Sequence, residues 1–193
     1  KKNGTLQFSR LARLAFIGKI ILKSLVKKEV INQRDYGSFL NSINTVATSI
    51  NLDFILFSQN KLGKDDFLNK YGHLRPGTYD ITSMTYNNNP KILEKTSQIF
   101  LETKNKNDFI LDNNLKTRID EELKGNNLKF DSLYLLNFIK ESLEARELSK
   151  FEFTKTLSYA LELIAEAGSM LGFSRQEMAQ LDIDLLLKIN EYD

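Results

Sequence analysis

The stretch "SLYLLNFIKESLEARELSKFEFTKTLSYALELIAEAGSML", residues 132–171, is the longest helical pattern in this sequence and decides its fold class. At about 100° per residue, its apolar side chains fall on one continuous face, as in an amphipathic helix. These apolar positions are Leu135, Ile139, Leu143, Phe153, Leu157, Leu161, Ile164 and Leu171. Ser132 suits the start of a helix and Gly172 its end. We therefore predict a helix over these residues, either continuous or broken once near residues 148–151.

Two basic residues, Arg146 and Lys150, lie in the middle of this apolar face. In one interpretation they are structural, because a break turns them toward solvent or because they pair with nearby acids while their stems cover apolar surface. In the other, they form a cationic floor for an anionic or hydroxyl-rich ligand. Arg146 would then supply a planar two-pronged donor and Lys150 a point charge. The second interpretation makes both of them candidate substrate-binding residues.

The rest of the chain also has mainly helical patterns. Further helices are predicted over residues 5–28, 35–59, 64–71 and 113–124, and after Ser174. Gly72 suits a left-handed C-terminal cap, and Gly125 suits a helix end. Ser174 with Glu177 three residues later is a capping-box pattern. A second N-cap is predicted at Asp182.

The predicted helix over residues 5–28 has one apolar stripe at helical spacing. The stripe comprises Leu11, Leu14, Ala15, Gly18, Ile21, Leu22 and Leu25. Gly18 permits close approach by a neighbouring helix. Phe16 and Ile20 point elsewhere, so we expect this helix to be covered on more than one side. A basic amphipathic helix at a membrane surface is the alternative.

Residues 87–108 are polar, Asn-rich and poorly periodic, which predicts a surface connection, and residues 108–112 could form a short strand or extended chain. The fold class predicted is therefore all-α, a multi-helix bundle with long helices, one ordered Gly/Pro loop and little or no β structure. We expect a single helical domain over residues 1–193, in which parts 1–90 and 110–193 pack together. Because the sequence starts with Lys and stops in an apparently helical stretch, we expect it to be a piece of a longer protein.

The composition excludes several classes of site. The sequence has no Cys and one His, so it cannot form a disulfide, a Cys-ligated zinc site or a His-rich metal site. Lys19 and Lys23 interrupt the only candidate for a membrane span or signal peptide. A reducing cytoplasm is the expected location. No metal and no membrane partner are expected.

The net charge of +2 conceals an asymmetry between the two halves of the sequence. Residues 1–100 carry 15 basic and 7 acidic side chains, and residues 101–193 carry 12 and 18. Residues 1–28 contain eight basic side chains and no acid. A solvated helix face explains this pattern, and an anionic partner such as a nucleic acid or a membrane surface is the alternative. We favour the solvated face and expect no nucleic-acid partner.

The common catalytic motifs are absent from the sequence. It contains no GxGxxG after a strand, no Walker A loop, no GxSxG and no HExxH. We therefore expect no self-contained catalytic apparatus in these 193 residues.

One short loop, "YGHLRPGTYDITS" at residues 71–83, collects the residues with the most chemical potential. Its candidate substrate-binding residues are Tyr71, His73, Arg75, Tyr79 and Asp80. Pro76 and two glycines favour a tight, ordered turn that holds its side chains in place. His73 near a carboxylate is chemically able to transfer a proton, which makes it the one candidate catalytic residue, but a lone histidine is more often a structural hydrogen-bonder.

Four stretches together resemble one known family. They are "GTLQFSRLARLAFIGKIILKSLV" (4–26), "YGHLRPGTYDITS" (71–83), "RELSKFEFTKTLSYALELI" (146–164) and "LGFSRQEMAQLDIDLLL" (171–187). In this order they look like the central helical region of phosphotransferases related to phosphoenolpyruvate synthase and pyruvate phosphate dikinase, particularly those that bacteria encode among surface-polysaccharide genes. The second and third stretches are the most specific. After the loop, this chain reads "MTYNNNP" where the family tends to have an Arg-Tyr pair followed by acids.

The resemblance implies a role for this chain within a larger enzyme. Such enzymes combine an ATP-grasp domain, a middle region and a swivelling domain whose histidine carries phosphate. The chain would be the middle region, inert by itself, with ATP and Mg²⁺ bound elsewhere in the parent protein and the other two domains as its partners. A small phosphoryl acceptor would then bind near residues 71–80, Arg146 and Lys150. A purely structural spacer between the two outer domains is the alternative.

Overall fold

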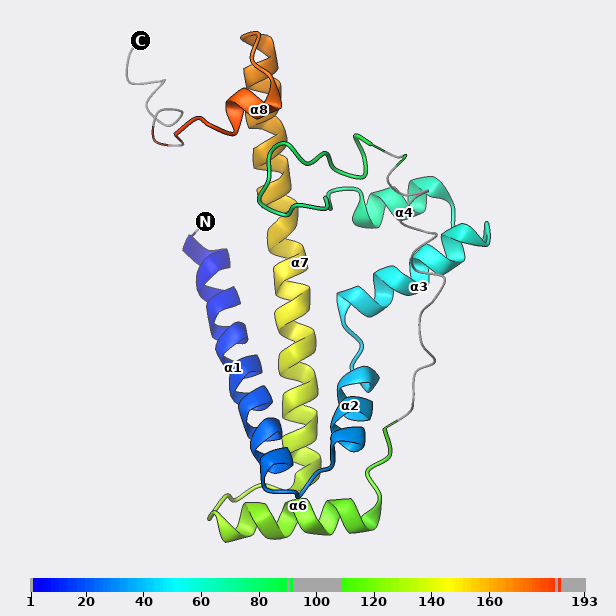
Figure 1. Cartoon of the computed structure of the whole chain (residues 1–193), viewed down its shortest axis with the longest axis vertical. Helices are drawn as coiled ribbons and strands as arrows, with labels where there is room; N and C mark the ends of the chain where they lie inside the picture. The colour runs from blue at the N-terminus through cyan, green and yellow to red at the C-terminus, as the bar shows by residue number, and fades with distance from the viewer. Residues whose placement is uncertain (1, 90, 92–108, 183, 185–193) are drawn as a thin grey trace. The chain divides into compact units, whose positions relative to one another are not determined.

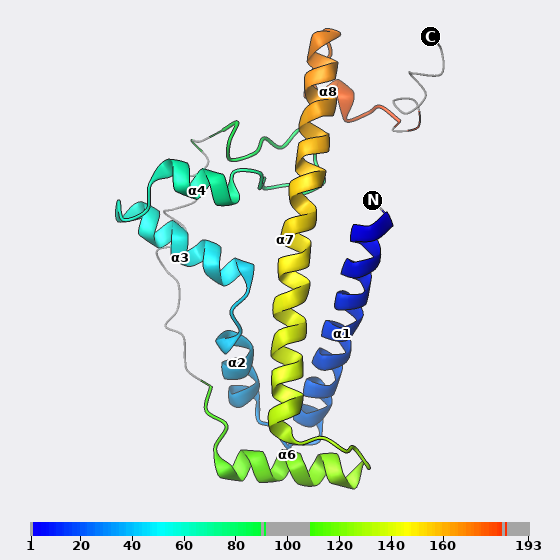
Figure 2. The same ribbon diagram turned by 180° about the vertical axis from the view of Figure 1, so that it is seen from behind.

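The structure is a computed structural model, which describes residues 2–89, 91, 109–182 and 184. In these residues it contains seven helices and no strand, which confirms the all-α prediction (Figures 1 and 2). The helices are α1 (Lys2–Lys27), α2 (Gln33–Ser42), α3 (Val46–Ser58), α4 (Lys64–Tyr71), α6 (Asn113–Gly125), α7 (Ser132–Met170) and α8 (Arg175–Met178). The predicted connection over 87–108 and the helix expected after Asp182 lie almost entirely outside the described residues.

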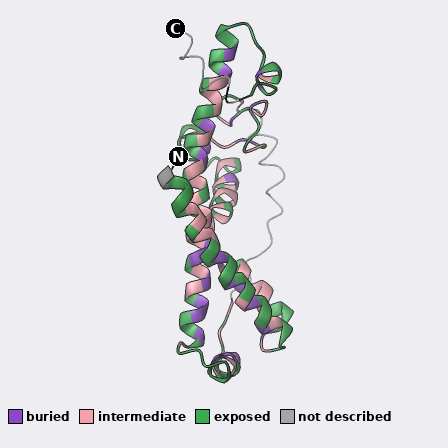
Figure 3. Ribbon diagram, turned by 90° about the vertical axis from the view of Figure 1, so that its left-hand side faces the viewer, coloured by how far each residue is buried: buried purple, intermediate pink, exposed green. Residues whose placement is uncertain are grey.

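Helix α7 runs from Ser132 to Met170 without interruption, so the break considered near residues 148–151 is absent. Buried and exposed residues alternate along it, as expected of a helix that is covered on part of its circumference (Figure 3). Gly172, at φ +84°, ends the helical path in the left-handed region that favours glycine. Ser174 then caps α8 through the predicted capping box with Glu177.

The single helix predicted over residues 35–59 is wrong, because the chain breaks between α2 and α3. Ile43 has an extended backbone conformation, φ −76° and ψ 126°, and its side chain is buried. The next residue, Asn44, donates its backbone N–H to the Glu144 carboxylate at 3.0 Å. A partner on α7 therefore satisfies a donor that a continuous helix would have used internally. The apolar periodicity of residues 39–57 gave no sign of this partner.

The chain divides into two compact units. Unit 1 comprises Lys1–Leu52 and Glu102–Phe151, and unit 2 comprises Asp53–Leu101 and Glu152–Asp193. Each unit thus combines segments that are distant in the sequence, and each is described by itself below.

Unit 1 is built on α1, α2, α6 and the first half of α7. Its buried core residues are Ala15, Leu22, Leu25, Ile31, Phe39, Ile43, Leu115, Ile119, Leu123, Leu135, Leu136, Ile139 and Leu143. Helix α1 lies beside the first half of α7 in the opposite direction, and α6 crosses near the start of α7 (Figures 1 and 2). Phe39 and Phe109 pack edge to face with their ring centroids 5.1 Å apart.

Gly18 is a point of close approach between α1 and α7, as its position in the α1 stripe predicted. A Cβ atom at Gly18 would lie 3.1 Å from the Cγ1 atom of Ile139, which is fully buried. The outer face of α1 differs from the expectation, because Phe16 and Ile20 are 56% and 66% exposed. Leu14 of the predicted stripe is also exposed, at 41%. In unit 1, α1 therefore packs along one side only.

Unit 2 contains the C-terminal part of α3 from Asp53 onward, then α4, the loop that follows it, the second half of α7, and α8. A cluster of aromatic side chains joins α3 to α4: Phe67 contacts the rings of Phe54, Phe57 and Tyr71, with centroids 4.6–5.6 Å apart. Phe54, Phe67 and Tyr71 are each at most 1% exposed. A second small core, Ile81, Ala165 and Met178, joins the loop to α7 and α8.

Gly72 ends α4 in a right-handed conformation, φ −59° and ψ −25°, so its prediction as a left-handed cap is wrong. Its small size is needed for packing instead. A Cβ atom there would lie 2.1 Å from the side-chain oxygen of Asn87 and 2.4 Å from the carbonyl oxygen of Leu68.

None of the helices in the described residues is long and apolar enough to cross a membrane.

Candidate functional site

The loop after α4 is held in a defined shape by its own backbone. The N–H of Tyr86 donates to the carbonyl of Leu74 at 2.9 Å, and the N–H of Asn87 donates to that of Gly72 at 3.0 Å. Gly77 approaches Asp80 so closely that a Cβ atom would lie 2.9 Å from the Asp80 Cβ. These contacts bring both ends of the loop together, which agrees with the predicted ordered Gly/Pro loop.

Arg75 is the centre of this loop and is buried, with its side chain 2% exposed. Its Nη1 donates to the carbonyl oxygens of Asp80 and Ser83 at 3.3 and 3.1 Å. Its Nη2 donates to the carbonyl oxygen and the Oγ of Ser158 at 3.1 and 2.9 Å. Arg75 therefore ties two points of the loop to α7. Burial lowers the pKa of Arg75, and the neighbouring Glu162 carboxylate offsets part of this effect.

Glu162 is the acid that balances this buried cation. Its Oε1 accepts from Arg75 at 2.9 Å, and its Oε2 accepts from Arg175 at 2.6 Å. Asn88 adds a further hydrogen bond to Oε2 at 2.6 Å. Burial alone would raise the pKa of Glu162, but the hydrogen bond and charge of Arg175, with the charge of Arg75, bring it below its usual value.

Arg175 extends the network to α8, since its Nη1 also donates to the carbonyl oxygen of Ile81 at 2.9 Å. Its guanidinium thus holds the loop and Glu162 at once. The carbonyl oxygen of His73 accepts from the Ser158 hydroxyl at 2.6 Å. The loop, the second half of α7 and α8 are in this way joined by charge-assisted hydrogen bonds within unit 2.

Tyr71 belongs to the aromatic cluster, in which its ring contacts that of Phe67. Its hydroxyl donates to the Asp53 carboxylate at 2.7 Å, and Lys70 donates to the same oxygen at 2.7 Å. Burial raises the pKa of the Tyr71 phenol. The hydrogen bond to Asp53 raises the pKa of Lys70. Because Tyr71 is 1% exposed, its role in the described structure is to join α4 to α3.

Tyr79 and Asp80 are the site residues of the loop that reach solvent. Tyr79 is 72% exposed. The Asp80 carboxylate accepts from the N–H and the hydroxyl of Thr82 at 2.9 and 2.7 Å, which lowers the pKa of Asp80. The side chain of His73 is half-buried.

Arg146 and Lys150 belong to unit 1. The half-buried Arg146 pairs with its neighbour Glu147, and its guanidinium lies over the ring of Phe16, 5.6 Å from the centroid. Lys150 is exposed. The pair between Arg146 and Glu147 agrees with the structural interpretation, in which these cations pair with nearby acids.

Ser158, Glu162 and Arg175 are the members of the network that sequence reasoning did not select. A signal for two of them exists in the α7 pattern: Thr154, Ser158 and Glu162 recur every four residues, so they form a polar stripe on one side of the helix. Thr154 and Ser158 are buried, at 7% and 4% exposed. A buried polar stripe needs hydrogen-bonding partners, and Arg75 of the loop is a partner of both Ser158 and Glu162.

No group of three His, Asp or Glu residues that could hold a metal ion occurs in the described part of the chain. Three open surface cavities lie in unit 1, and residues 71–80 line none of these three.

Comparisons of the chain with models of protein families, with curated proteins and with solved structures found no match.

Proposed function

We propose that this chain is the central helical region of an ATP-dependent phosphotransferase that resembles phosphoenolpyruvate synthase. One observation carries the proposal: three of the stretches on which the resemblance rests meet in one network. Arg75 comes from residues 71–83, Ser158 and Glu162 come from residues 146–164, and Arg175 comes from residues 171–187. Because these stretches depend on one another for burial and hydrogen bonding, their resemblance to the family is better explained by one shared domain than by separate similarities.

Within this proposal the loop has a supporting and a presenting part. Arg75 shapes the loop, because its Nη donors are directed at oxygens of the chain itself. Tyr79 and Asp80 are exposed and thus open to a phosphoryl acceptor. His73, whose carbonyl oxygen accepts a hydrogen bond from the Ser158 hydroxyl on α7, would orient the acceptor hydroxyl. ATP and Mg²⁺ would bind in another domain of the parent protein.

The parent polypeptide allows a direct test. The complete open reading frame is incubated with ATP, Mg²⁺ and candidate acceptors, and AMP and phosphate are measured. Tyr79→Ala should raise the KM for the acceptor, while Tyr159→Ala, which alters another exposed tyrosine, on α7, should leave it unchanged. A complete polypeptide without an ATP-grasp or phosphohistidine domain would remove the proposal.

A structural spacer between the two outer domains is the second candidate, and the burial of Arg75 favours it. A guanidinium that is 2% exposed and bonded to its own chain stabilises the fold and has little surface for a ligand. The spacer role predicts that acceptors cause no thermal stabilisation of the chain and that Tyr79→Ala leaves the KM unchanged. The same pair of tyrosine variants therefore separates the two candidates.

A further inference from the structure

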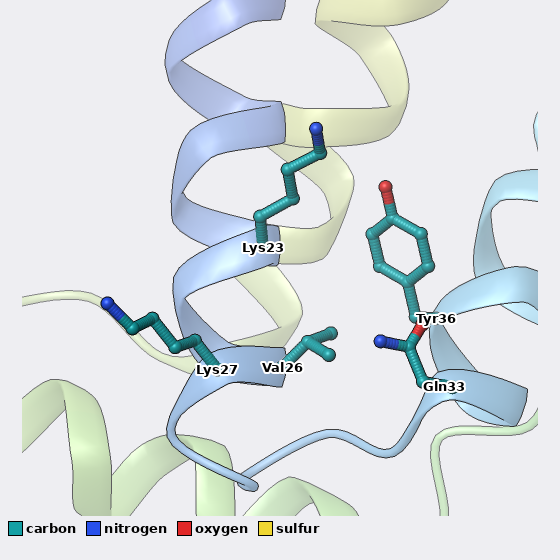
Figure 4. A pocket seen from close by; sticks show the side chains of 5 residues that line it. All are labelled: Lys23, Val26, Lys27, Gln33 and Tyr36. Carbon is teal, nitrogen blue, oxygen red and sulfur yellow. The ribbon is translucent and has the colours of Figure 1, made fainter.

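A surface cavity of about 330 Å³ opens in unit 1 between the last turns of α1 and the first turn of α2 (Figure 4). Five side chains line it: Lys23, Val26, Lys27, Gln33 and Tyr36. The volume is within the range of small-molecule sites, which begins at roughly 300 Å³. No acidic side chain belongs to this lining.

The polar groups of the cavity are not used by the described fold. The side chains of Lys23, Lys27, Gln33 and Tyr36 make no hydrogen bond or ion pair within the described part of the chain. Both lysines are exposed and Tyr36 is half-buried against the core of unit 1. Four unused polar groups, two of them cationic, thus border one hollow.

Figure 4 shows how these groups are directed. The Lys23 ammonium and the Tyr36 hydroxyl extend toward the same end of the cavity, from α1 and α2 respectively. Lys27 extends the other way, so it contributes charge at longer range. Val26 and the ring of Tyr36 give the cavity an apolar wall.

This combination selects the chemistry of a ligand. An ammonium and a neutral phenol both donate hydrogen bonds, and a second nearby cation favours a ligand with more than one negative charge. A phosphomonoester carries about −1.5 to −2 charge at pH 7 and three strong acceptor oxygens, whereas a carboxylate carries one charge and two oxygens. Eight basic and no acidic side chains in residues 1–28 add to the attraction.

We propose that this cavity binds a small phosphomonoester, with its phosphate between the Lys23 Nζ and the Tyr36 hydroxyl. Its organic part lies against Val26 and the Tyr36 ring, and the Gln33 amide hydrogen-bonds a polar group on it. The site lies wholly in unit 1, and it does not depend on the function proposed for the loop.

Titration of the 193-residue chain tests this site. Phenyl phosphate is the probe, and chemical shifts of the backbone amides are followed by NMR at constant ionic strength. Saturable shifts should centre on residues 23–36. Benzoate and inorganic phosphate should each bind more weakly by about tenfold, because one lacks the dianion and the other lacks the organic part.

Matched variants assign the contacts. Lys23→Gln and Tyr36→Phe should each raise the Kd by about tenfold, and Lys27→Gln by only about twofold to threefold. Lys116→Gln on α6 removes one charge from the same unit but not from the cavity, and should leave the Kd unchanged. Thermal unfolding of each variant verifies that it remains folded.

Several results would overturn the proposal. They are the absence of saturable shifts, an equal loss of binding in Lys116→Gln, and unchanged binding in Lys23→Gln or Tyr36→Phe. Equal affinity for benzoate would overturn the choice of a phosphomonoester. Equal affinity for inorganic phosphate would overturn the role of Val26 and the tyrosine ring.

Discussion

Arg75 and Ser158 lie 83 positions apart, yet one guanidinium nitrogen of Arg75 bonds both the hydroxyl and the carbonyl oxygen of Ser158, at 2.9 and 3.1 Å. A carbonyl within a helix normally accepts only the bond of its own helix, so the loop uses a remaining lone pair of Ser158. The Ser158 hydroxyl in turn donates a hydrogen bond to the carbonyl oxygen of His73 at 2.6 Å. One position of α7 therefore bonds two residues of the loop, Arg75 and His73.

Arg75→Lys should destabilise the chain by about 3 kcal/mol, because it removes a buried cationic group whose Nη1 and Nη2 atoms are hydrogen-bonded to the loop, Ser158 and Glu162. Lysine carries its donors on one nitrogen and cannot reach the loop carbonyls and Ser158 together. Urea unfolding monitored by circular dichroism measures the change. Arg34→Lys on the exposed part of α2 is the matched control. A loss below about 0.5 kcal/mol, as at ordinary surface sites, would contradict the bracing role.

Glu162 should make the free energy of unfolding depend on pH in the acid range. Its folded pKa is lower than the usual value of 4.5, so ionised Glu162 stabilises the fold at pH values above 4.5. This contribution is lost as the pH falls through the folded pKa. Glu162→Gln should cost about 3 kcal/mol at pH 7 and nothing below both pKa values.

The measurement for Glu162 is the free energy of unfolding from about pH 7 down to about pH 3. The control is Glu152→Gln, which breaks the exposed pair between Glu152 and Lys155 and should change stability by less than about 1 kcal/mol. Coincident curves for wild type and Glu162→Gln across this range would show that the carboxylate contributes nothing.

Gly18→Val should destabilise unit 1 by about 2 kcal/mol, since the added methyl groups enter space that Ile139 occupies. Gly37 offers the opposite case, because no atom lies within 4 Å of a Cβ atom placed there. Gly37→Ala should stabilise α2 by about 0.5–1 kcal/mol. Thermal unfolding of both variants gives the comparison.

A double variant connects the cost of Gly18→Val to its neighbour. Combined with Ile139→Ala, the valine should cost less than it does alone, which a double-mutant cycle measures as a coupling energy. Additive effects of the two substitutions would place the strain somewhere other than Ile139.

Tyr71→Phe should cost about 1 kcal/mol, because it removes the hydroxyl that donates to Asp53 but keeps the ring in the aromatic cluster. Tyr79→Phe removes a hydroxyl from a side chain that is 72% exposed and should have no measurable effect. Chemical denaturation of the two variants distinguishes them. A similar loss in both would show that the hydrogen bond to Asp53 is not what stabilises this position.

The long helices were predictable from sequence because their patterns and caps are local. Ser132, Gly172 and the Ser174 capping box lie where the sequence placed them. The break at Ile43 was not predictable, since Glu144, which receives the Asn44 N–H, is 100 positions away. Gly72 shows the same limit: glycine at a helix end suggested a left-handed cap, but its reason is the proximity of Asn87.

For the candidate site, the sequence identified the loop but not the state of its residues. Arg75 looked like a ligand-binding cation, and its burial depends on Ser158 and Glu162, 83 and 87 positions away. Tyr71 was likewise selected as a substrate-binding residue, and its hydroxyl donates to the Asp53 carboxylate. The roles of Tyr79, Arg146 and Lys150 in binding remain predictions.

The aromatic packing of the two units also allows the unfolding of each unit to be followed separately by fluorescence. The sequence contains no tryptophan, so a single introduced indole would have no native background in fluorescence. Phe109→Trp would place it beside Phe39 in unit 1, and Phe57→Trp would place it beside Phe67 in unit 2. Coincident unfolding transitions in the two variants would show that the two units unfold cooperatively. Separate transitions would show that they unfold independently.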